Sequence, residues 1–280
     1  MTQGKIIKII SNDYTVSSPS GTFLCKSCGK FRKMGITPLV GDEVKFEERD
    51  HYILEVLPRK NELLRPPVAN IDQAFVITSV KDPNFSSNLL DKLLTIIEYH
   101  RMEAKICFTK LDLLTEQERQ EFQNIMNYYE SLGYQIFDHQ QLEPFKTVFA
   151  GKVSVFTGQS GAGKSTLINQ LDPQFRLQTG EISYALGRGK HTTRHVELLP
   201  LYGGFVADTP GFSSLNFYDM NATDIRDQFP EFNAAKEFCE YRDCMHLKEE
   251  KCEVKRRVTC GMILKSRYDN YLHFIESKRG

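Results

Sequence analysis

The segment from 158 to 165 restricts the possible folds of this chain more than any other part. Its sequence, GQSGAGKS, matches the phosphate-binding pattern G-x-x-x-x-G-K-S at every fixed position. It follows the apolar run VSVF and precedes TLINQL, which can begin a helix. Glycines let backbone N–H groups surround phosphate oxygens, and the helix N-terminus adds its positive end. We therefore expect Lys164 to contact the β- and γ-phosphates and Ser165 to ligate Mg²⁺.

Strands and helices alternate on the N-terminal side of this loop. The apolar runs AFVITSV, KICFTK and VSVFTG are typical of buried strands. Two amphipathic stretches, LLDKLLTIIEYH and TEQERQEFQNIMNYYESLG, separate them. This alternation predicts a mostly parallel sheet with helices on both faces. We assign residues 67–224 to this α/β domain, and a chain of 280 residues leaves room for two more domains.

The first part of the chain has a different pattern. Short runs of β-forming residues, KIIKII, YTVSS, TFLCKS and EVKFEE, are separated by glycine-containing turns. They predict a small β-barrel of the oligonucleotide/oligosaccharide-binding (OB) type over residues 1–66. The segment 58–69, PRKNELLRPPVA, contains three prolines and is predicted to be a linker.

Residues 225–280 are predicted to form a helical domain that is too short to bury a large core of its own. The spacing Cys239-x₄-Cys244-x-His246-x₅-Cys252 supplies three thiolates and one imidazole. That is a complete tetrahedral set for one structural zinc ion. Cys260 is an alternative ligand, and free thiols in a core are the alternative interpretation.

The remaining cysteines carry a weaker signal. Cys25 and Cys28 form a single C-x-x-C pair with no other ligand type nearby, so a metal or redox role for them stays open. Cys107 lies in the middle of an apolar run and is expected in the core.

Two further tetrapeptides complete a guanine nucleotide site. Asp208-Thr209-Pro210-Gly211 follows the apolar run GGFVA, where the Asp can bind Mg²⁺ through water and the Gly N–H can contact a γ-phosphate. Thr109-Lys110-Leu111-Asp112 follows KICF. A carboxylate at this place can accept hydrogen bonds from guanine N1–H and its exocyclic amine, and a site built for those donors rejects adenine. Taken alone, DTPG could be a common turn and TKLD a plain strand end.

The order of these motifs is unusual, because the base-reading tetrapeptide precedes the phosphate loop. Between the loop and Asp208 lies the basic segment 187–194, GRGKHTTR, a candidate switch that could equally be a solvated loop. Many GTPases place a water-orienting Gln after the last Gly of the Asp-x-x-Gly motif. Here Phe212 follows, and His191 and His195 are the nearby candidates for that task. Slow intrinsic hydrolysis is therefore expected.

The permuted motif order, with a β domain before it and a Cys/His domain after it, resembles the RsgA (YjeQ) family of circularly permuted GTPases. The resemblance rests mainly on GQSGAGKST, GRGKHTTRH, DTPG and the cysteine cluster, and it extends over the whole chain. It implies a barrel, a GTPase domain and a zinc domain. It also implies a role in late maturation of the small ribosomal subunit, which stimulates hydrolysis.

The resemblance further implies which switch residues act on the nucleotide. Thr192 or Thr193 would close over Mg²⁺ and the γ-phosphate, so the catalytic candidates are Lys164, Ser165, Thr192, Thr193 and His191. The expected nucleotide contacts are Thr109, Lys110, Leu111, Asp112, Gly158, Gln159, Ser160, Gly161, Ala162, Gly163, Lys164, Ser165, Thr166, Asp208 and Gly211.

Three positions depart from the family pattern. Thr109 replaces the usual Asn of the base-reading motif, which should weaken base binding modestly. No Ser-Ala-type loop is evident around 137–139, so no residue is assigned to that contact. The zinc segment lacks a proline that is common in the family, although its ligand types remain.

The expected partners are the small ribosomal subunit and its rRNA, with GTP or GDP, Mg²⁺ and one zinc ion per chain as cofactors. The net charge is zero, so RNA must be bound by local patches. The segments Lys251–Arg267 and Lys26–Lys33 are rich in Lys and Arg and are the candidates. No apolar run is long enough for a membrane helix and no signal peptide is evident, so we expect a cytoplasmic protein, and a monomer.

Two other functions fit parts of the sequence. A phosphate-loop ATPase or nucleotide kinase would share the loop, although Asp112 opposes it. An RNA-binding protein that uses GTP only as a structural switch would explain Phe212.

Overall fold

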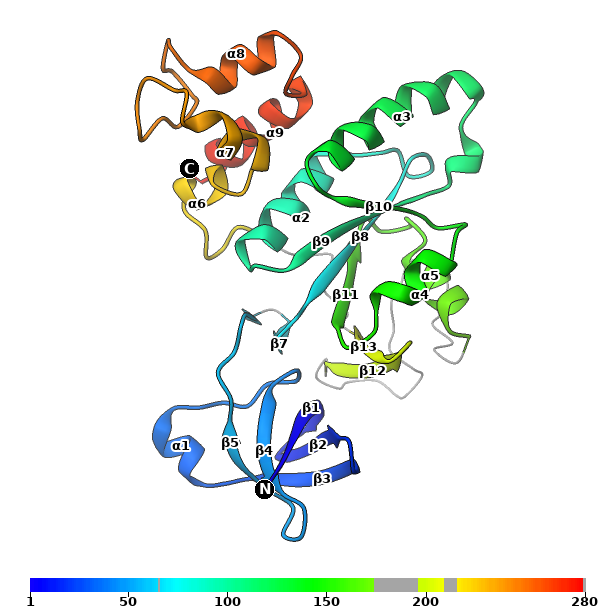
Figure 1. Cartoon of the computed structure of the whole chain (residues 1–280), viewed down its shortest axis with the longest axis vertical. Coiled ribbons are helices and arrows are strands. Elements are labelled where there is room, and N and C mark those ends of the chain that lie inside the picture. Colours follow the sequence, from blue (N-terminus) through cyan, green and yellow to red (C-terminus); the bar gives the residue numbers. More distant parts are fainter. Residues whose placement is uncertain (65, 174–195, 209–215, 279–280) are drawn as a thin grey trace.

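The N-terminal strands close into a barrel. A computed structural model describes residues 1–64, 66–173, 196–208 and 216–278 (Figure 1). Its first elements are β1 (Thr2–Ile10), β2 (Asp13–Ser18), β3 (Gly21–Ser27), α1 (Lys30–Met34), β4 (Glu43–Glu47) and β5 (Tyr52–Val56). The strand order is β1-β2-β3-β5-β4, and β4 pairs again with β1. Alternate residues, among them Val16, Val44 and Phe46, fill the interior, as the period of a β-strand requires. The expected OB-like barrel is confirmed.

The proline-rich segment 58–69, predicted to be a linker, connects the barrel to the central sheet and is itself folded. It contains a hairpin of β6 (Glu62–Leu64) and β7 (Pro67–Ala69). Val68 is fully buried and makes an isolated bridge with Val40. Apolar residues of this segment thus pack against residues outside it.

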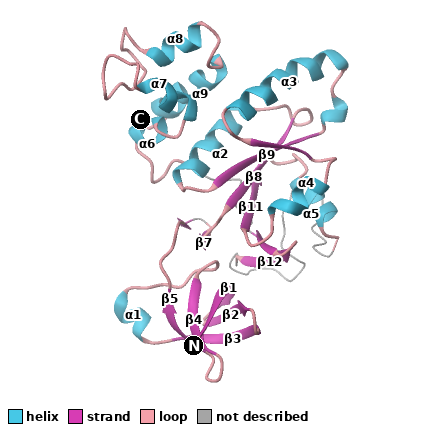
Figure 2. Ribbon diagram, in the orientation of Figure 1, coloured by secondary structure: helices cyan, strands magenta, loops and turns pink. Residues whose placement is uncertain are grey.

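The central part is the expected mostly parallel sheet with helices on both faces (Figures 1 and 2). Its strand order is β10-β9-β8-β11-β13-β12, in which only β12 runs antiparallel to its neighbour. The strands are β8 (Gln73–Ser79), β9 (Glu103–Thr109), β10 (Gln135–Asp138), β11 (Val153–Gly158), β12 (Glu197–Leu201) and β13 (Gly204–Asp208). The helical segments are α2 (Ser87–Tyr99), the 3₁₀ turn η1 (Leu111–Leu113), α3 (Glu116–Ser131), α4 (Glu143–Val148) and α5 (Lys164–Leu171).

Alternation along the buried strands divides the core between the two faces of the sheet. On β8, Ala74 and Val76 belong to the cluster that α2 and α3 cover. Phe75 and Ile77 belong to the opposite cluster, which α4 and α5 cover, and Cys107 lies there as expected. Both faces of β8 and β11 are therefore buried, which explains their continuous apolar sequences.

The barrel joins the central sheet at one edge. β1 pairs with β12 through Lys8 and Glu197, and the Lys8 ammonium lies 2.7 Å from the Glu197 carboxylate. This contact is possible because β4 pairs only with the first residues of β1, Thr2 to Lys5. The later part of β1 keeps one free edge for β12.

The last part of the chain is helical, as predicted. It contains α6 (Ala222–Arg226), α7 (Pro230–Lys236), α8 (Glu253–Thr259) and α9 (Lys265–Glu276). Its apolar residues do not form a separate core. They belong to the same cluster as the residues of α2 and α3. Helix α9 packs directly against α2, so this part is attached to the sheet through that helix.

Candidate functional site

Segments from distant parts of the sequence meet at one edge of the central sheet. The parallel strands β10, β9, β8, β11 and β13 all end there, in this spatial order. The segments at these strand ends are 139–141 after β10, the base-reading motif after β9, 80–86 after β8 and the phosphate loop after β11, and β13 ends at Asp208. Ligands bind at the carboxyl ends of parallel strands. The permuted order in the sequence thus leaves the spatial order of a nucleotide site intact.

The phosphate loop requires glycine at its first position. Gly158 has a φ of +131°, and a Cβ atom there would lie 1.9 Å from the carbonyl oxygen of Ile77 on β8. Gly161 and Gly163 also have positive φ values, of 75° and 90°. Helix α5 then begins at Lys164, so the N–H groups of its first turn face the loop. This is the backbone arrangement that binds phosphate.

The Lys164 side chain is folded back over the loop. Its ammonium donates hydrogen bonds to the carbonyls of Gly158 at 2.9 Å and Gln159 at 2.7 Å. Burial lowers the pKa of Lys164 to about 8, because water no longer stabilises the charged form. The charge is therefore weakly compensated in this state, and phosphate oxygens would provide the missing counter-charge.

The base-reading motif is tied to the phosphate loop by its first residue. The hydroxyl of Thr109, which is buried at 2% exposure, donates a hydrogen bond of 2.7 Å to the carbonyl of Ala162. Lys110 adopts a left-handed conformation with a φ of 61°, and η1 carries Leu111 and Asp112 beyond it. Thr109 thus holds the two motifs together. Its hydroxyl makes this contact although the side-chain amide of the usual Asn is missing at this position.

The sequence indicates no contact residue in the loop after β10. In the structure, Gln140 of this loop contacts the base-reading motif. The amide of Gln140 lies 3.4 Å from the Asp112 carboxylate and donates to it. The turn is held by Asp138, whose side chain accepts from the backbone N–H of Gln140 at 3.0 Å. No sequence motif indicates this contact, because it depends only on β10 and β9 being neighbours.

The segment 80–86 also contacts both motifs and was not singled out from the sequence. Lys110 donates to the carbonyl of Asp82, and Gln159 donates to the carbonyl of Asn84 at 3.3 Å. The ring of Pro83 lies near Gly161. This segment therefore lies between the base-reading motif and the phosphate loop, because β8 lies between β9 and β11.

The switch residues lie outside the described residues. This applies to Thr192, Thr193, His191, His195 and Phe212, and to Thr209, Pro210 and Gly211 of the DTPG motif. The structure does place the end of β13, the strand paired with β11, at Asp208.

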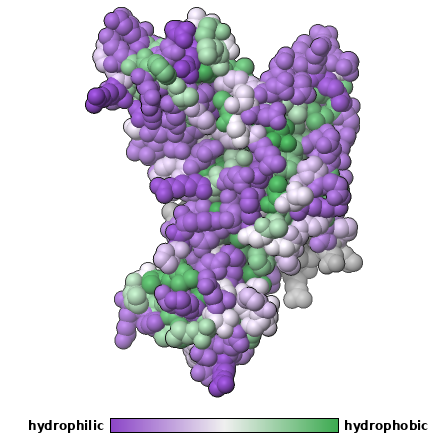
Figure 3. All heavy atoms as spheres, in the orientation of Figure 1, coloured by the Kyte–Doolittle hydropathy of each residue, from purple (hydrophilic) through white to green (hydrophobic). Residues whose placement is uncertain are grey.

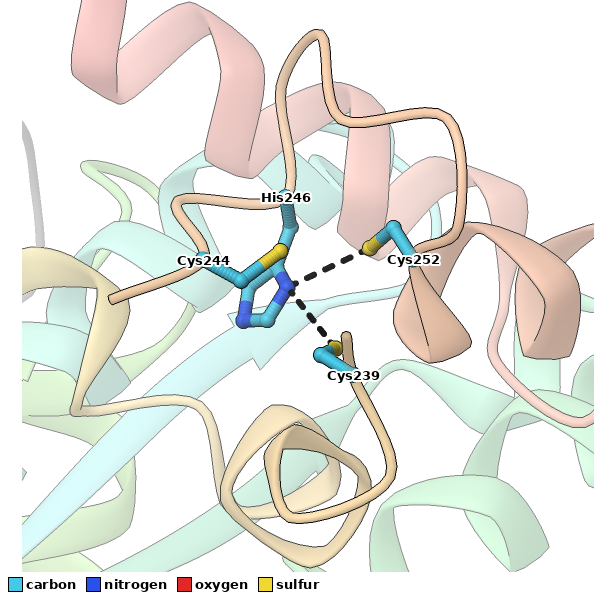
Figure 4. Close-up of side chains that lie close together, drawn as sticks. All are labelled: Cys239, Cys244, His246 and Cys252. Atoms are coloured by element: carbon cyan, nitrogen blue, oxygen red, sulfur yellow. Dashed lines mark hydrogen bonds between the residues drawn. The ribbon is translucent and has the colours of Figure 1, made fainter. Parts of the chain in front are cut away.

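The second candidate site is a cluster of three cysteines and one histidine (Figure 4). The ligand atoms of Cys239, Cys244, His246 and Cys252 all lie within 4.8 Å of one another. The His246 Nδ1 atom is 3.3 Å from the Cys252 sulfur and 3.8 Å from the Cys239 sulfur. Cys260 is exposed and is not part of the cluster. Cys25 is buried in the barrel, and no metal cluster among the described residues includes it.

These four side chains fit a tetrahedral metal ion. Zinc–sulfur and zinc–nitrogen bonds of standard length place nitrogen about 3.6 Å from sulfur in a tetrahedron. Burial raises the pKa of the Cys244 thiol to about 12 and lowers the pKa of His246 to about 4. The imidazole is thus neutral, the form that binds metal, whereas a buried Cys244 thiolate requires a nearby cation. The arrangement is that of a structural site with no open position.

The expected basic surface near the cluster is smaller than its sequence indicated. Arg267 is only 1% exposed and pairs with buried carboxylates, so it cannot contact RNA, contrary to the prediction. Arg256 and Arg257 both pair with Glu253, at 2.7 Å and 2.9 Å. Lys251 and Lys265 remain exposed but also have acidic neighbours. Figure 3 shows this part of the molecule as mainly hydrophilic.

Similarity to known families agrees with this geometry. A family model described as RsgA GTPase matches residues 56–218, and one described as RsgA N-terminal domain matches residues 3–52. A protein from Enterococcus faecalis named small ribosomal subunit biogenesis GTPase RsgA is 52% identical over 286 residues, which cover 99% of this chain and 96% of the relative. A relative from Oceanobacillus iheyensis, named small ribosomal subunit biogenesis GTPase RsgA 2, is 50% identical, with coverage of 99% and 97%.

Two solved structures share the whole fold. The crystal structure of YloQ, described as a circularly permuted GTPase, has a TM-score of 0.86 at 38% identity and covers 100% of this chain and 95% of its own. YjeQ from Thermotoga maritima has a TM-score of 0.87 at 33% identity, with coverage of 100% and 99%. With its phosphate loop, base-reading motif and Cys₃His cluster in these positions, the chain belongs to the RsgA GTPase family and is a GTP hydrolase.

Proposed function

We propose that this protein binds GTP at the carboxyl edge of the central sheet and hydrolyses it when it is docked on the small ribosomal subunit, during late maturation of that subunit. The observation that carries the nucleotide assignment is the hydrogen bond from Thr109 to the carbonyl of Ala162, which holds the base-reading motif against the phosphate loop. The subunit is the partner because the relatives are named for its biogenesis.

Each part of the nucleotide has a matching element at this edge. The Asp112 carboxylate would accept from guanine, with Gln140 leaving that carboxylate when the base arrives. Lys164 would move from the loop carbonyls to the β- and γ-phosphates, and the N–H groups at the start of α5 would bind phosphate oxygens. Ser165 would ligate Mg²⁺, which supplies positive charge between the phosphates. The site thereby neutralises charge and orients the γ-phosphate.

The switch residues remain candidates by family resemblance. We propose that Thr192 or Thr193 closes on the metal and γ-phosphate, that His191 is a candidate for positioning water, and that Asp208 and Gly211 complete the site. Phe212 cannot orient water, so the docked subunit would supply the ordering that hydrolysis needs.

The C-terminal cluster would hold one zinc ion through Cys239, Cys244, His246 and Cys252. Zinc would stabilise the fold of residues 225–280 there and take no part in the reaction. We keep residues 1–66, 67–224 and 225–280 as the proposed domains, acting together as a monomer.

The proposed contact with rRNA uses the exposed lysines of the two basic segments rather than Arg267. In the barrel segment, Lys30 and Lys33 are exposed and form no ion pair with any described residue. A cytoplasmic location follows from the proposed partner. No helix among the described residues has the length and apolar character needed to cross a bilayer.

The deciding experiment measures GTP turnover by the protein alone, with small subunits and with large subunits. Acceleration by small subunits only is expected. Equal turnover in all three reactions would contradict the proposal, and GTP-dependent subunit binding without turnover would favour an RNA-binding switch. Competition by ATP at equal strength would contradict the guanine assignment and favour a phosphate-loop ATPase.

A further inference from the structure

A buried polar cluster joins the C-terminal part to the first turn of α2. Arg267 on α9 donates to the Asp91 carboxylate at 2.7 Å and forms two bonds with Glu231 on α7, at 2.7 Å and 2.9 Å. Tyr129 on α3 also donates to Asp91 at 2.7 Å. Asp91 and Arg267 are 0% and 1% exposed. Two helices of the GTPase part, α2 and α3, and two of the C-terminal part, α7 and α9, therefore meet at Asp91 and Arg267.

Both the nitrogen and the oxygen of the Asn270 side-chain amide form hydrogen bonds with the start of α2. Its nitrogen donates to Asp91 at 2.6 Å and to the Ser87 hydroxyl at 3.3 Å. Its oxygen accepts from the Asn88 side chain at 3.1 Å. Three of the first five residues of α2 are thus held by a single buried side chain of α9.

That turn of α2 directly follows the segment 80–86, which contacts the nucleotide motifs. Within this segment, the Asn84 carbonyl accepts from Gln159 and the Pro83 ring lies near Gly161 of the phosphate loop. Ser86 caps α2 by accepting from the Leu89 N–H. The first turn of α2 and the phosphate loop are therefore linked by a short stretch of backbone that is held at both ends.

The adjoining part of α9 holds the segment that carries the metal ligands. The hydroxyls of Tyr268 and Tyr271 donate to the carbonyls of His246 and Met245, each at 2.6 Å. Neighbouring side chains of one helix thus contact both the metal-binding segment and α2.

In the contact between Arg267 and Asp91, each residue has a second partner within its own part of the chain. Removing one member of a buried ion pair is usually costly because an uncompensated charge remains. Here Arg267 would keep both bonds to Glu231, which lies in the C-terminal part itself. Asp91 would keep the Tyr129 hydroxyl from its own part. Each side therefore keeps at least one hydrogen-bond partner of its own when the contact changes.

We propose that Asn270 and Arg267 are positioning residues for the nucleotide site, through which α9 couples the metal-binding part to the phosphate loop by way of the first turn of α2. This inference rests on the proposed function, since it assigns a regulation to the same site. It does not depend on the switch segments. Because coupling is reciprocal, nucleotide should tighten the contact of α9 with α2, and loosening that contact should change nucleotide affinity.

The test combines an exchange measurement on the wild type with one variant and a matched control. In the wild-type protein, GDP should slow amide hydrogen exchange in α9 as well as in the phosphate loop. Asn270→Ala should change the Kd for GDP by about five-fold or more, the lower end of usual coupling between sites. It should also abolish the effect of GDP on α9 exchange while zinc content is retained. Asp269→Asn, an exposed neighbour on the same helix, should behave as wild type.

The outcomes separate the two proposals. If wild-type protein binds GDP but exchange in α9 is unchanged, or if Asn270→Ala keeps zinc and the wild-type Kd, the inference fails and the nucleotide site stands. If wild-type protein does not bind GDP, the proposed function fails and the inference fails with it. Should Asn270→Ala not fold, the wild-type exchange measurement decides alone.

Discussion

Raising the pH above 8 is expected to weaken nucleotide binding through Lys164. In the nucleotide-free structure, burial lowers the pKa of Lys164 to about 8. Phosphate oxygens favour the charged ammonium, so the pKa of Lys164 is higher in the complex. Binding therefore takes up a proton whenever the free protein has lost one. Lys164 of the free protein must be protonated for tight binding. The affinity for nucleotide therefore falls as the pH rises through the pKa of Lys164 in the free protein, which is lower than its pKa in the complex.

The size of the effect follows from that value. With a pKa of about 8, roughly nine-tenths of the free protein carries the proton at about pH 7 and roughly one-tenth at about pH 9. The Kd for GDP should thus rise about ten-fold between these pH values, which corresponds to about 1.4 kcal/mol. Near pH 8, binding should take up about half a proton.

Calorimetric titration with GDP in buffers of different ionisation enthalpy measures both quantities. Lys164→Arg is the control, because a guanidinium stays protonated over the whole range while any titration of the guanine base is retained. The Kd of this variant should change much less with pH than that of the wild type. A wild-type Kd that is constant from about pH 7 to about pH 9, or one that follows the Arg variant, would refute the assignment of Lys164 as a half-desolvated phosphate ligand.

Four further substitutions test separate parts of the site. Asp112→Asn should reduce GTP affinity and increase affinity for xanthine nucleotides, measured by competition, because the base then offers the complementary group. Thr109→Val should weaken binding of GTP and GDP by a similar factor, roughly 1 kcal/mol for the lost bond to the phosphate loop; an unchanged Kd would show that the bond does not position the loop. Gly158→Ala should abolish nucleotide binding, because its Cβ meets a backbone carbonyl of β8 at 1.9 Å; wild-type binding by this variant would contradict that geometry. Cys239→Ser should lower zinc content from about one ion per chain and loosen residues 225–280 first, as judged by metal analysis and limited proteolysis; unchanged zinc content would count against the cluster.

The motif-bearing parts of this protein could be predicted from sequence because local spacing determines them. A phosphate loop needs glycines and a lysine at fixed positions, and the four metal ligands lie within one short segment, so neither depends on distant contacts. The barrel and the parallel sheet were equally accessible, since the period of the apolar residues changes where one ends and the other begins.

Contacts between distant elements were not accessible in this way. Gln140 and Pro83 lie near the two nucleotide motifs only because of the order of the strands, which no local pattern specifies. Arg267 was assigned to a basic surface, yet it lies one helical turn from Asn270 and Tyr271 on the buried face of α9. Arginine is usually exposed, so Arg267 was expected on the surface. It belongs instead to a face of α9 whose other residues are also buried. The packing of the proline-rich linker was equally inaccessible, because Leu63 and Val68 contact residues in other parts of the chain.

The single pairing between β1 and β12 has a consequence for how the chain is made. Every strand of the barrel lies within the first 56 residues, so we expect the barrel to close on itself soon after it leaves the ribosome. Its partner strand β12 begins only at Glu197 and is paired on its other side by β13. The newly made barrel must therefore remain without its contact to β12 through most of translation, with the later part of β1 exposed as an open edge. A protein proposed to mature ribosomes would thus depend, during its own synthesis, on that edge staying unpaired until the last strands of the central sheet arrive.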